Sequence, residues 1–456
     1  MGWESATVST LINSRTMSGF RDYPPALMLP REKILQTARD VYKSYGFAPI
    51  DTPACESLEV LLGKGGEESD KRIYAVRMVE SKKEEMGLRF DLTVPFARFA
   101  AQHINDLGTP FKRYAMGPVW RGERPGLGRY REFWQCDFDT IGTTSNAADI
   151  ETALVINDLF TAIGFDRFEV RVNNRLVLNG LLEQYGLTAQ AVPVLRALDK
   201  LPKIGRDMVI EEMTREAGVT GEQAATVLRL AEVSGTNDDI LNQAESLFTG
   251  SPNDRGAEGV RRLRELLEVA KTAGIPDGRI RIDLSIARGL DYYTGTIYET
   301  FLTDLSGIGS VCSGGRYDNL ASQYTKQVLP GVGASLGLDR LVAAMEELKH
   351  PLLAARSTPA QVLVVQFEAA RLGDYQRVAR ALRAAGIATE VYPDAKKVGQ
   401  QLAFAEKRGF PLAVIAGPAE FEQGVWKVKD LAKREELATS EAELPAAVRR
   451  LISGAG

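Results

Sequence analysis

One stretch of the sequence places ring, amide and carboxylate side chains two residues apart. Residues 131–142 read REFWQCDFDTIG, and their alternation predicts a β-strand. Because successive side chains of a strand point to opposite faces, one face would carry Arg131, Phe133, Gln135, Asp137 and Asp139. Such a face can recognise a small polar molecule, but a sheet face exposed to water has a similar composition. The pattern alone leaves both interpretations open.

A cluster of arginines precedes this strand. Arg121 ends another predicted strand, TPFKRYAMGPVWR, and the loop GERPGLG joins the two strands as a hairpin that also carries Glu123, Arg124 and Arg129. Guanidinium groups offer phosphate oxygens a planar fork of donors, so the hairpin is a candidate site for a phosphate-bearing ligand. A lattice of solvated salt bridges would have the same sequence. The chain lacks the glycine-rich loop with lysine that defines a P-loop.

A third stretch, RGLDYYTGTIYE at residues 288–299, sets Arg288 beside a glycine and shortly before Tyr292 and Tyr293. On these residues alone, a buried strand with packed tyrosines and an arginine at a turn is the simpler interpretation. The stretch becomes informative only in combination with the other two.

The remaining sequence predicts the elements that position these residues. An amphipathic helix begins at Arg31 and ends before Gly46, another helix covers residues 145–165, and a third has Arg340 near its start, off its apolar stripe. After residue 360, three short predicted strands, QVLVVQF, ATEVYP and LAVIAG, alternate with helical patterns, which is typical of a small α/β domain. We therefore expect the following parts: a flexible leader at 1–16, a main domain at 17–350 with a helical insertion at about 185–280, a linker at 351–359, and an α/β domain at 360–456.

Composition narrows the class of protein. With 456 residues, 44% hydrophobic and 25% charged, the chain reads as a globular protein of two or three domains. It has no apolar run that could span a bilayer, and its three cysteines and two histidines give no disulfide framework or zinc spacing, so we expect a cytoplasmic protein without membrane contact. The net charge is −4, but residues 360–456 carry 14 Lys or Arg against 12 Asp or Glu, a weak indication of a nucleic-acid-facing module.

Four motifs carry a family resemblance. FKRYAMGPVWRGERPGLGRYREFWQCDFDTIG resembles the second signature motif of the class II aminoacyl-tRNA synthetases, and GVGASLGLDRL resembles their third. RGLDYYTGTIYE and SGGRYDNL are similar to the two segments that distinguish histidyl-tRNA synthetases within that class. The resemblance runs from about Gly19 into the C-terminal domain. It implies an α+β fold: an antiparallel sheet flanked by helices, a helical insertion and a C-terminal anticodon-binding domain.

The resemblance also implies how ATP is bound as a substrate, with Mg²⁺ accompanying it. Arg121 would hold the α-phosphate, Glu123 would lie near the adenine edge, and Phe133 and Arg340 would sandwich the base. Arg288 matches an arginine on the other side of the α-phosphate and the substrate carboxylate, so Arg121 and Arg288 are the expected catalytic residues.

For the second substrate, L-histidine, the resemblance implies a pocket of polar residues. Asp91 and Thr93 match positions that hold the amino group, and Arg121 and Arg288 would also contact the carboxylate. The other matched positions around the bound histidine are Gln135, Asp139, Tyr292, Tyr293 and Tyr317. Common bacterial members carry glutamate where this chain has Asp139.

The implied activity joins histidine to AMP and transfers it to tRNA(His), in a homodimer. Two alternatives remain: a catalytically silent regulatory subunit of ATP phosphoribosyltransferase, and a nucleic-acid-binding α/β protein without catalysis. The silent relatives generally lack the anticodon-type domain and let the ATP arginines drift, whereas this chain keeps Arg121, Arg288 and Arg340. A departure in the hairpin loop, Gly126 where many bacterial members have glutamine, puts reading of the extra 5′ guanosine of tRNA(His) in doubt.

Arg288→Ala is expected to abolish adenylate formation with the fold intact. Loss of one preorganised charge donor typically lowers the rate by about 10²–10³. Histidine-dependent exchange between pyrophosphate and ATP measures this step, and the melting temperature controls for the fold. Near-normal exchange would remove Arg288 from the mechanism.

Overall fold

The computed structural model describes residues 13–63, 70–81, 83, 85–248, 254–286, 292–353 and 356–453. The chain divides into two compact units, of which one holds Ile34–Leu348 with the segment that ends at Arg21, and the other holds Asp22–Lys33 with Lys349–Gly456. Most of the expected leader, and Arg288, lie outside the described residues. No helix in the described part of the chain is long and apolar enough to cross a membrane.

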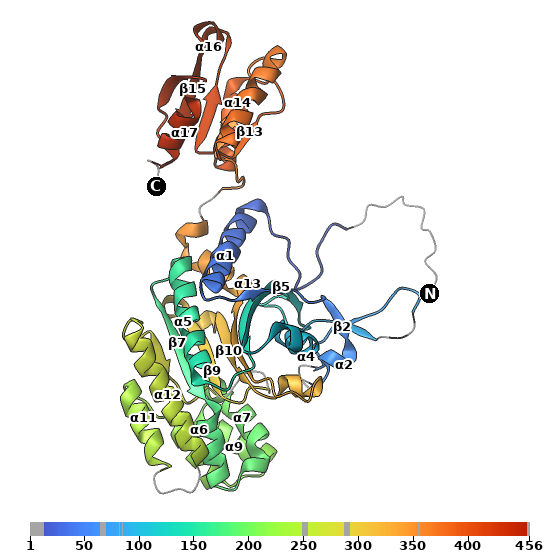
Figure 1. Cartoon of the computed structure of the whole chain (residues 1–456), viewed down its shortest axis with the longest axis vertical. Helices are drawn as coiled ribbons and strands as arrows, with labels where there is room; N and C mark the ends of the chain where they lie inside the picture. The colour runs from blue at the N-terminus through green and yellow to red at the C-terminus, as the bar shows by residue number, and fades with distance from the viewer. Residues whose placement is uncertain are drawn as a thin grey trace. The chain divides into compact units, whose positions relative to one another are not determined.

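An eight-stranded sheet forms the centre of the first unit (Figure 1). It is antiparallel except at its two outermost pairs, β1–β5 and β7–β8, which are parallel. In spatial order its strands are β1 (Ala48–Pro49), β5 (Phe111–Trp120), β6 (Glu132–Ile141), β11 (Gly331–Gly337), β10 (Cys312–Tyr317), β9 (Thr296–Leu302), β7 (Phe168–Asn174) and β8 (Ile280–Ile282).

The β5–β6 hairpin is the expected one, and its register decides which side chains face each other. Arg113 pairs with Asp139 and Gly117 with Gln135. The loop closes in a tight turn, in which Gly126 and Arg129 exchange two backbone hydrogen bonds of 3.0 Å.

Helices cover both faces of this sheet. On one face, Tyr42 of α1 (Pro25–Ser44) packs on Tyr114 and Phe138, and α5 (Asn146–Ile163) packs on β7, β10 and β11. The other face carries α4 (Thr93–Leu107) over the β5–β6 region. Helix α13 (Leu338–Leu348) follows β11 directly along the chain. The start expected for α1 was wrong, since the helix begins at Pro25. Proline is tolerated at the first helical position because no backbone N–H is needed there.

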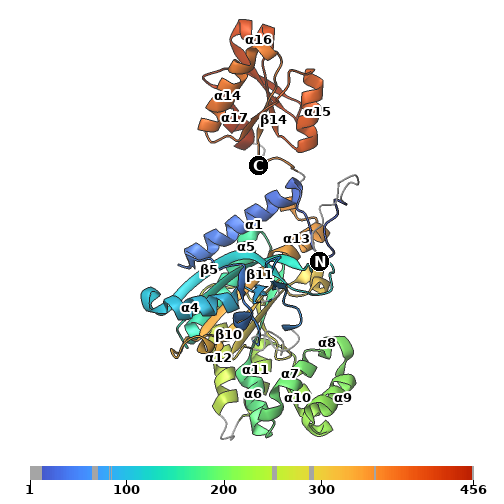
Figure 2. The same cartoon turned by 90° about the vertical axis from the view of Figure 1, so that its right-hand side faces the viewer.

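Smaller elements complete the first unit. A three-stranded sheet contains β2 (Cys55–Ser57), β4 (Met86–Leu88) and β3 (Ala75–Val76), with α2 (Leu58–Leu61) beside it. The insertion is helical as expected, although helix formation starts earlier than residue 185, and its helices gather at one end of the unit (Figure 2). They are α6 (Arg175–Gln184), α7 (Ala191–Leu198), α8 (Leu201–Ile204), α9 (Arg206–Ala217), α10 (Gly221–Ala231), α11 (Asn237–Ser246) and α12 (Asp254–Thr272).

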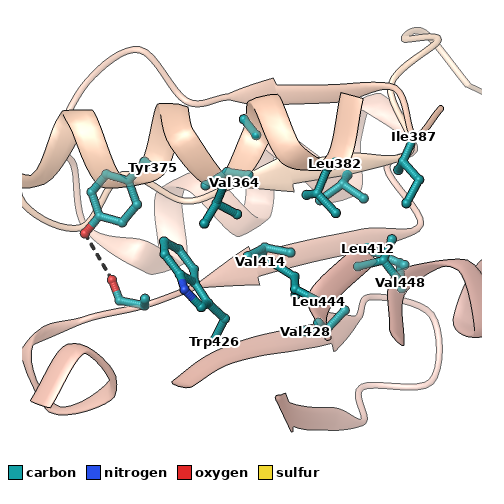
Figure 3. Close-up of a cluster of buried hydrophobic side chains, with 14 residues drawn as sticks. Val364, Tyr375, Leu382, Ile387, Leu412, Val414, Trp426, Val428, Leu444 and Val448 are labelled. Carbon is teal, nitrogen blue, oxygen red and sulfur yellow. Dashed lines mark hydrogen bonds between the residues drawn. The ribbon is translucent and has the colours of Figure 1, made fainter. Parts of the chain in front are cut away.

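The second unit contains a five-stranded mixed sheet in the order β13 (Thr389–Val391), β12 (Val362–Val364), β14 (Leu412–Ile415), β15 (Val425–Asp430) and β16 (Glu436–Ser440). Its helices are α14 (Leu372–Ala384), α15 (Val398–Arg408), α16 (Pro418–Gln423) and α17 (Leu444–Ser453). One core lies between α14, α17 and the sheet, where the Tyr375 hydroxyl donates to the Ala416 carbonyl at 3.0 Å (Figure 3). The sequence predicted the first three strands along the chain but not β15 and β16.

Candidate active site

The carboxylate-bearing face of β6 is buried. Gln135 is 8% exposed, Asp137 2% and Asp139 3%, so the alternative of a sheet face in water does not hold for these residues. Helix α4 accounts for part of this cover, because its Phe96 side chain lies under the Arg113 guanidinium, 4.3 Å from the ring centre. Buried polar groups of this kind need partners, either within the protein or from a ligand.

Two glycines of the GVGASLG stretch make room for the polar groups. A Cβ atom at Gly333 would lie 2.3 Å from Asp139 Oδ1, and a Cβ atom at Gly331 would lie 2.4 Å from the Tyr317 ring. Strand β11 can therefore pass between β6 and β10 only because these two positions lack side chains. The third motif thus contributes space to the site as well as residues.

An open pocket of about 610 Å³ lies between the hairpin and the start of α13. All four residues expected to bind ATP line it: Arg121, Glu123, Phe133 and Arg340. Further lining residues that the sequence did not single out for binding include Gly128, Tyr130, Ser310, Ser313, Ser335 and Gly337. These residues reach the pocket through strand register and loop packing, which the sequence does not show. The spacing of Ser335 and Gly337, two residues apart in a strand, could have indicated that they share one face.

Hydrogen bonds and ring contacts orient the two arginines of this pocket. Arg121 Nε donates to the Phe90 carbonyl at 3.1 Å, and its guanidinium carbon lies 4.4 Å and 5.1 Å from the ring centres of Phe90 and Phe133. Arg340 Nη1 donates to the Ser310 carbonyl at 2.5 Å. A guanidinium group that is held in place, as that of Arg121 is, can bind an anion without first having to be ordered.

A second cluster of expected residues lies beside that pocket. Asp91 accepts hydrogen bonds from the backbone of Thr93 at 3.1 Å and, less closely, from the Tyr292 hydroxyl at 3.4 Å. The Tyr292 ring lies edge-on to Tyr293 at 5.2 Å and to Tyr317 at 6.0 Å. Three tyrosines and a carboxylate thus form one cluster of aromatic rings and polar groups.

Asp139 belongs to the same cluster and has both of its oxygens engaged. Oδ1 accepts from the Tyr317 hydroxyl at 2.7 Å, and Oδ2 lies 2.7 Å from Arg113 Nη2. Gln135 lies on the same face of β6 as Asp139 and also lines the first pocket. Its amide nitrogen donates to Ser335 Oγ at 2.8 Å, and its Oε1 is buried with no hydrogen-bond partner among the described residues.

Arg113 is the important residue that sequence reasoning missed. It was read only as part of a strand, whereas it is 0% exposed and ion-paired with Asp139. A usable signal existed, because counting outward from the hairpin loop places residues 113 and 139 opposite each other. Arg288, in contrast, lies outside the described residues, so its expected position stays a prediction.

Burial changes the ionisation of the carboxyl groups. It raises the pKa of Asp139, against the opposing effects of Arg113 and the Tyr317 hydrogen bond, and it also raises the pKa of Asp91. Asp137 is affected most clearly: burial raises its pKa to about 7, Arg113 acts to lower it, and neighbouring Asp139 raises it further. Arg113 therefore acts to lower the pKa of both Asp137 and Asp139.

The site thus places an arginine-lined pocket beside a buried cluster of carboxylates and tyrosines. The first can bind a phosphate-bearing molecule, and the second offers acceptors to N–H groups of a small molecule. An antiparallel sheet that supports both is the arrangement expected of a class II aminoacyl-tRNA synthetase.

Comparisons with known proteins agree with this class. The family model described as histidyl-tRNA synthetase matches residues 19–341, and the model described as an anticodon binding domain matches residues 361–451. The chain belongs to the histidyl-tRNA synthetase family.

Individual relatives support the assignment over most of the chain. A histidine–tRNA ligase of Rhodopirellula baltica is 56% identical over 425 residues, which cover 93% of this chain and 95% of that protein. A histidine–tRNA ligase of Wolinella succinogenes is 44% identical over 421 residues, covering 92% and 94%. The crystal structure of histidyl-tRNA synthetase from Nostoc sp. PCC 7120 has a TM-score of 0.86 at 35% identity and covers 96% of this chain and all of that one, which confirms the expected fold class.

Asp137→Asn is expected to change the pH dependence of stability. Because the pKa of Asp137 is raised to about 7, the folded protein holds a proton between about pH 4 and 7 that the unfolded chain releases. This group's contribution to the free energy of unfolding therefore falls as pH rises through that window. The asparagine variant lacks this loss, so its melting temperature relative to the native chain should rise between pH 5 and pH 8.

Scanning calorimetry at both pH values measures the difference. Asp304→Asn is the matched control, because Asp304 is 41% exposed and pairs with Arg167 at the surface. A difference between the Asp137 variant and the native chain that does not change with pH would show that Asp137 is ionised throughout.

Proposed function

We propose that the chain is a histidine–tRNA ligase that activates L-histidine with ATP and transfers it to the 3′ end of tRNA(His). The observation that carries the proposal is that one face of β6 bears residues of two neighbouring groups: Phe133 and Gln135 line an arginine-lined pocket formed by the second and third motifs, and Asp139 belongs to a buried tyrosine–carboxylate cluster. Family membership supports the same activity.

In the first step, a carboxylate oxygen of histidine attacks the α-phosphorus of ATP. A bond forms between these atoms, the bond to the bridging oxygen breaks, and pyrophosphate leaves. The carboxylate is already ionised at neutral pH, so the step needs no general base. Arg121, held by the Phe90 carbonyl, and Arg288 would bring the two anions together and stabilise charge on the phosphoryl oxygens.

Magnesium enters this step as part of the nucleotide substrate, bound to its phosphates. In the described part of the chain, no group of three or more His, Cys, Asp or Glu side chains could hold a metal ion by itself. Phe133 and Arg340 would enclose the base, and Glu123 would accept from its amino group; the ion pair of Glu123 with Arg72, at 3.4 Å, holds that carboxylate at the pocket wall.

Recognition of histidine would use the second cluster. A neutral imidazole presents one N–H donor and one nitrogen acceptor. Asp139 would accept the N–H bond, a tyrosine hydroxyl would donate to the other nitrogen, and Asp91 with Thr93 would hold the ammonium group. Such a site rejects apolar analogues because its buried polar groups would be left without partners.

In the second step, a hydroxyl of the tRNA 3′-terminal ribose attacks the carbonyl carbon of the adenylate, and AMP leaves. The second unit would bind the anticodon, since residues 361–451 match the anticodon binding domain. We also propose a homodimer in the cytoplasm. The alternative of a regulatory subunit is not favoured: the solved Bacillus halodurans protein titled as such a subunit or synthetase is 21% identical and shows a shared fold alone.

Asp139→Asn tests the histidine half of the proposal. The amide can present a donor where an acceptor is needed, so the KM for histidine should rise by about 10- to 100-fold, the effect of losing a charge-assisted hydrogen bond of about 1.5–3 kcal/mol. The KM for ATP should change little. Steady-state pyrophosphate exchange gives both constants. An unchanged histidine KM with a raised ATP KM would show that this carboxylate is assigned to the wrong substrate.

The tRNA half can be tested at the hairpin loop. Gly126 has no side chain to read a base, and its backbone N–H and carbonyl are both bonded to Arg129 at 3.0 Å. Arg124 and Arg129 can bind phosphates, but phosphate contacts do not read sequence. Deleting the extra 5′ guanosine from tRNA(His) transcripts should therefore reduce charging only slightly, measured at fixed salt because phosphate contacts are salt-sensitive.

Two variants sharpen this test. A Cβ atom at Gly126 would meet no other atom within 4 Å, so Gly126→Gln fits and should increase the preference for the guanosine, whereas Gly126→Ala should not. A loss above about 100-fold for the native chain on the shortened transcript, about 2.7 kcal/mol, would mean that other residues read this base.

A further inference from the structure

Arg113 lies beneath the site without lining the nucleotide pocket. It is 0% exposed and is enclosed by the Phe96 ring of α4, the start of that helix and the β6 strand opposite. Its Nη2 atom makes two contacts: one of 2.7 Å with Asp139 Oδ2, and one in which it donates to the Leu92 carbonyl at 3.2 Å. A single guanidinium nitrogen thus joins strand β6 to the segment that carries Asp91 and Thr93.

This arrangement includes buried groups that destabilise the folded state. Arg113 Nε and Nη1 are buried with no hydrogen-bond partner among the described residues, and a buried donor in that state is destabilising. Buried ion pairs are often no more stabilising than well-packed apolar side chains of the same volume. Stability alone therefore does not account for an arginine at this position.

The need to orient Asp139 does account for an arginine at position 113. Asp139 is held at Oδ1 by the Tyr317 hydroxyl and at Oδ2 by Arg113, so its carboxylate plane is fixed before any ligand enters. The charge of Arg121 acts on Asp91, and Arg113 supplies the opposite charge that acts on both Asp137 and Asp139. Without that charge, a buried carboxylate takes up a proton and no longer accepts from an N–H donor through both oxygens.

We propose that Arg113 is a positioning residue for histidine recognition, which acts by holding Asp139 ionised and at a fixed distance from the Asp91–Thr93 segment. The inference rests on the proposed role of Asp139 in binding the imidazole ring. It adds that the spacing between the ammonium-binding and imidazole-binding groups is set by one buried guanidinium rather than by the strands alone.

The test is a double-mutant cycle between residues 113 and 139, with KM for histidine and KM for ATP measured by pyrophosphate exchange. Arg113→Met, which keeps the length of the side chain, should raise the histidine KM by at least about 10-fold, the effect of losing a hydrogen bond to a charged group. The ATP KM should change by less than about 3-fold. In the Asp139→Asn background the same substitution should change the histidine KM by less than about 3-fold, because the residue through which Arg113 acts is already altered.

Arg113→Lys provides the conservative rescue. An ammonium keeps the charge but not the planar fork, so it should recover a large part of the histidine KM that methionine loses. If Arg113→Met yields no folded protein, the cycle is run with Arg113→Lys, and its smaller effect should again vanish beside Asp139→Asn.

Arg316→Met is the matched control. Arg316 is also buried, but it lies on the opposite face of the sheet and pairs with Asp149 of α5, at 3.1 Å and 3.0 Å from Nε. Its loss should lower the melting temperature without a selective effect on the histidine KM. Arg113 substitutions that raise both KM values equally, or that add fully to Asp139→Asn, would overturn the inference, whereas an Asp139→Asn variant with an unchanged histidine KM would instead overturn the proposed role of Asp139.

Discussion

Three buried carboxyl groups, Asp91, Asp137 and Asp139, meet over one face of the central sheet, and the structure around them is arranged to make that possible. An ionised carboxylate removed from water is strongly destabilised unless it is paired or accepts hydrogen bonds. Backbone N–H groups at the start of α4 serve Asp91, while Arg113 and Tyr317 serve Asp139. Burial raises the pKa of Asp137 to about 7 although Arg113 acts to lower it. Two acceptors on the same face of β6, Gln135 Oε1 and Asp137 Oδ1, are buried without a hydrogen-bond partner among the described residues and could accept from N–H donors of a small molecule.

The backbone geometry of the β5–β6 hairpin and of strand β11 determines how the buried carboxyl groups are paired and accommodated. Register places Arg113 opposite Asp139, and Gly333 leaves the space that the Asp139 side chain fills. The same hairpin extends past the carboxylates to Arg121 and Phe133, which line the arginine-lined pocket. One pair of strands therefore carries, at a fixed separation, the groups that we propose for the two substrates, as a reaction between two anions requires.

Sequence reasoning reached the hairpin, the helical insertion, the helix at α5 and the grouping of Arg121, Glu123, Phe133 and Arg340, because these depend on local patterns. It could not decide whether the Asp137–Asp139 face meets water, since that depends on α4 packing against it from elsewhere in the chain. It missed Arg113 because its role follows from register rather than from residue type. Strand β16, ELATS, was missed because it is a largely exposed edge strand without an apolar pattern, and the first turns of α1 because Pro25 and Pro30 resemble helix breakers.

We infer that the tyrosine–carboxylate cluster selects histidine for reaction with ATP in the adjoining pocket. ATP–pyrophosphate exchange, measured with the purified chain and each of the twenty amino acids in turn, tests it most directly. We expect exchange with histidine and negligible exchange with the other amino acids. Only the imidazole side chain offers both an N–H donor and a ring-nitrogen acceptor. Exchange supported by a different amino acid, or binding of histidine and ATP with no exchange at all, would contradict it.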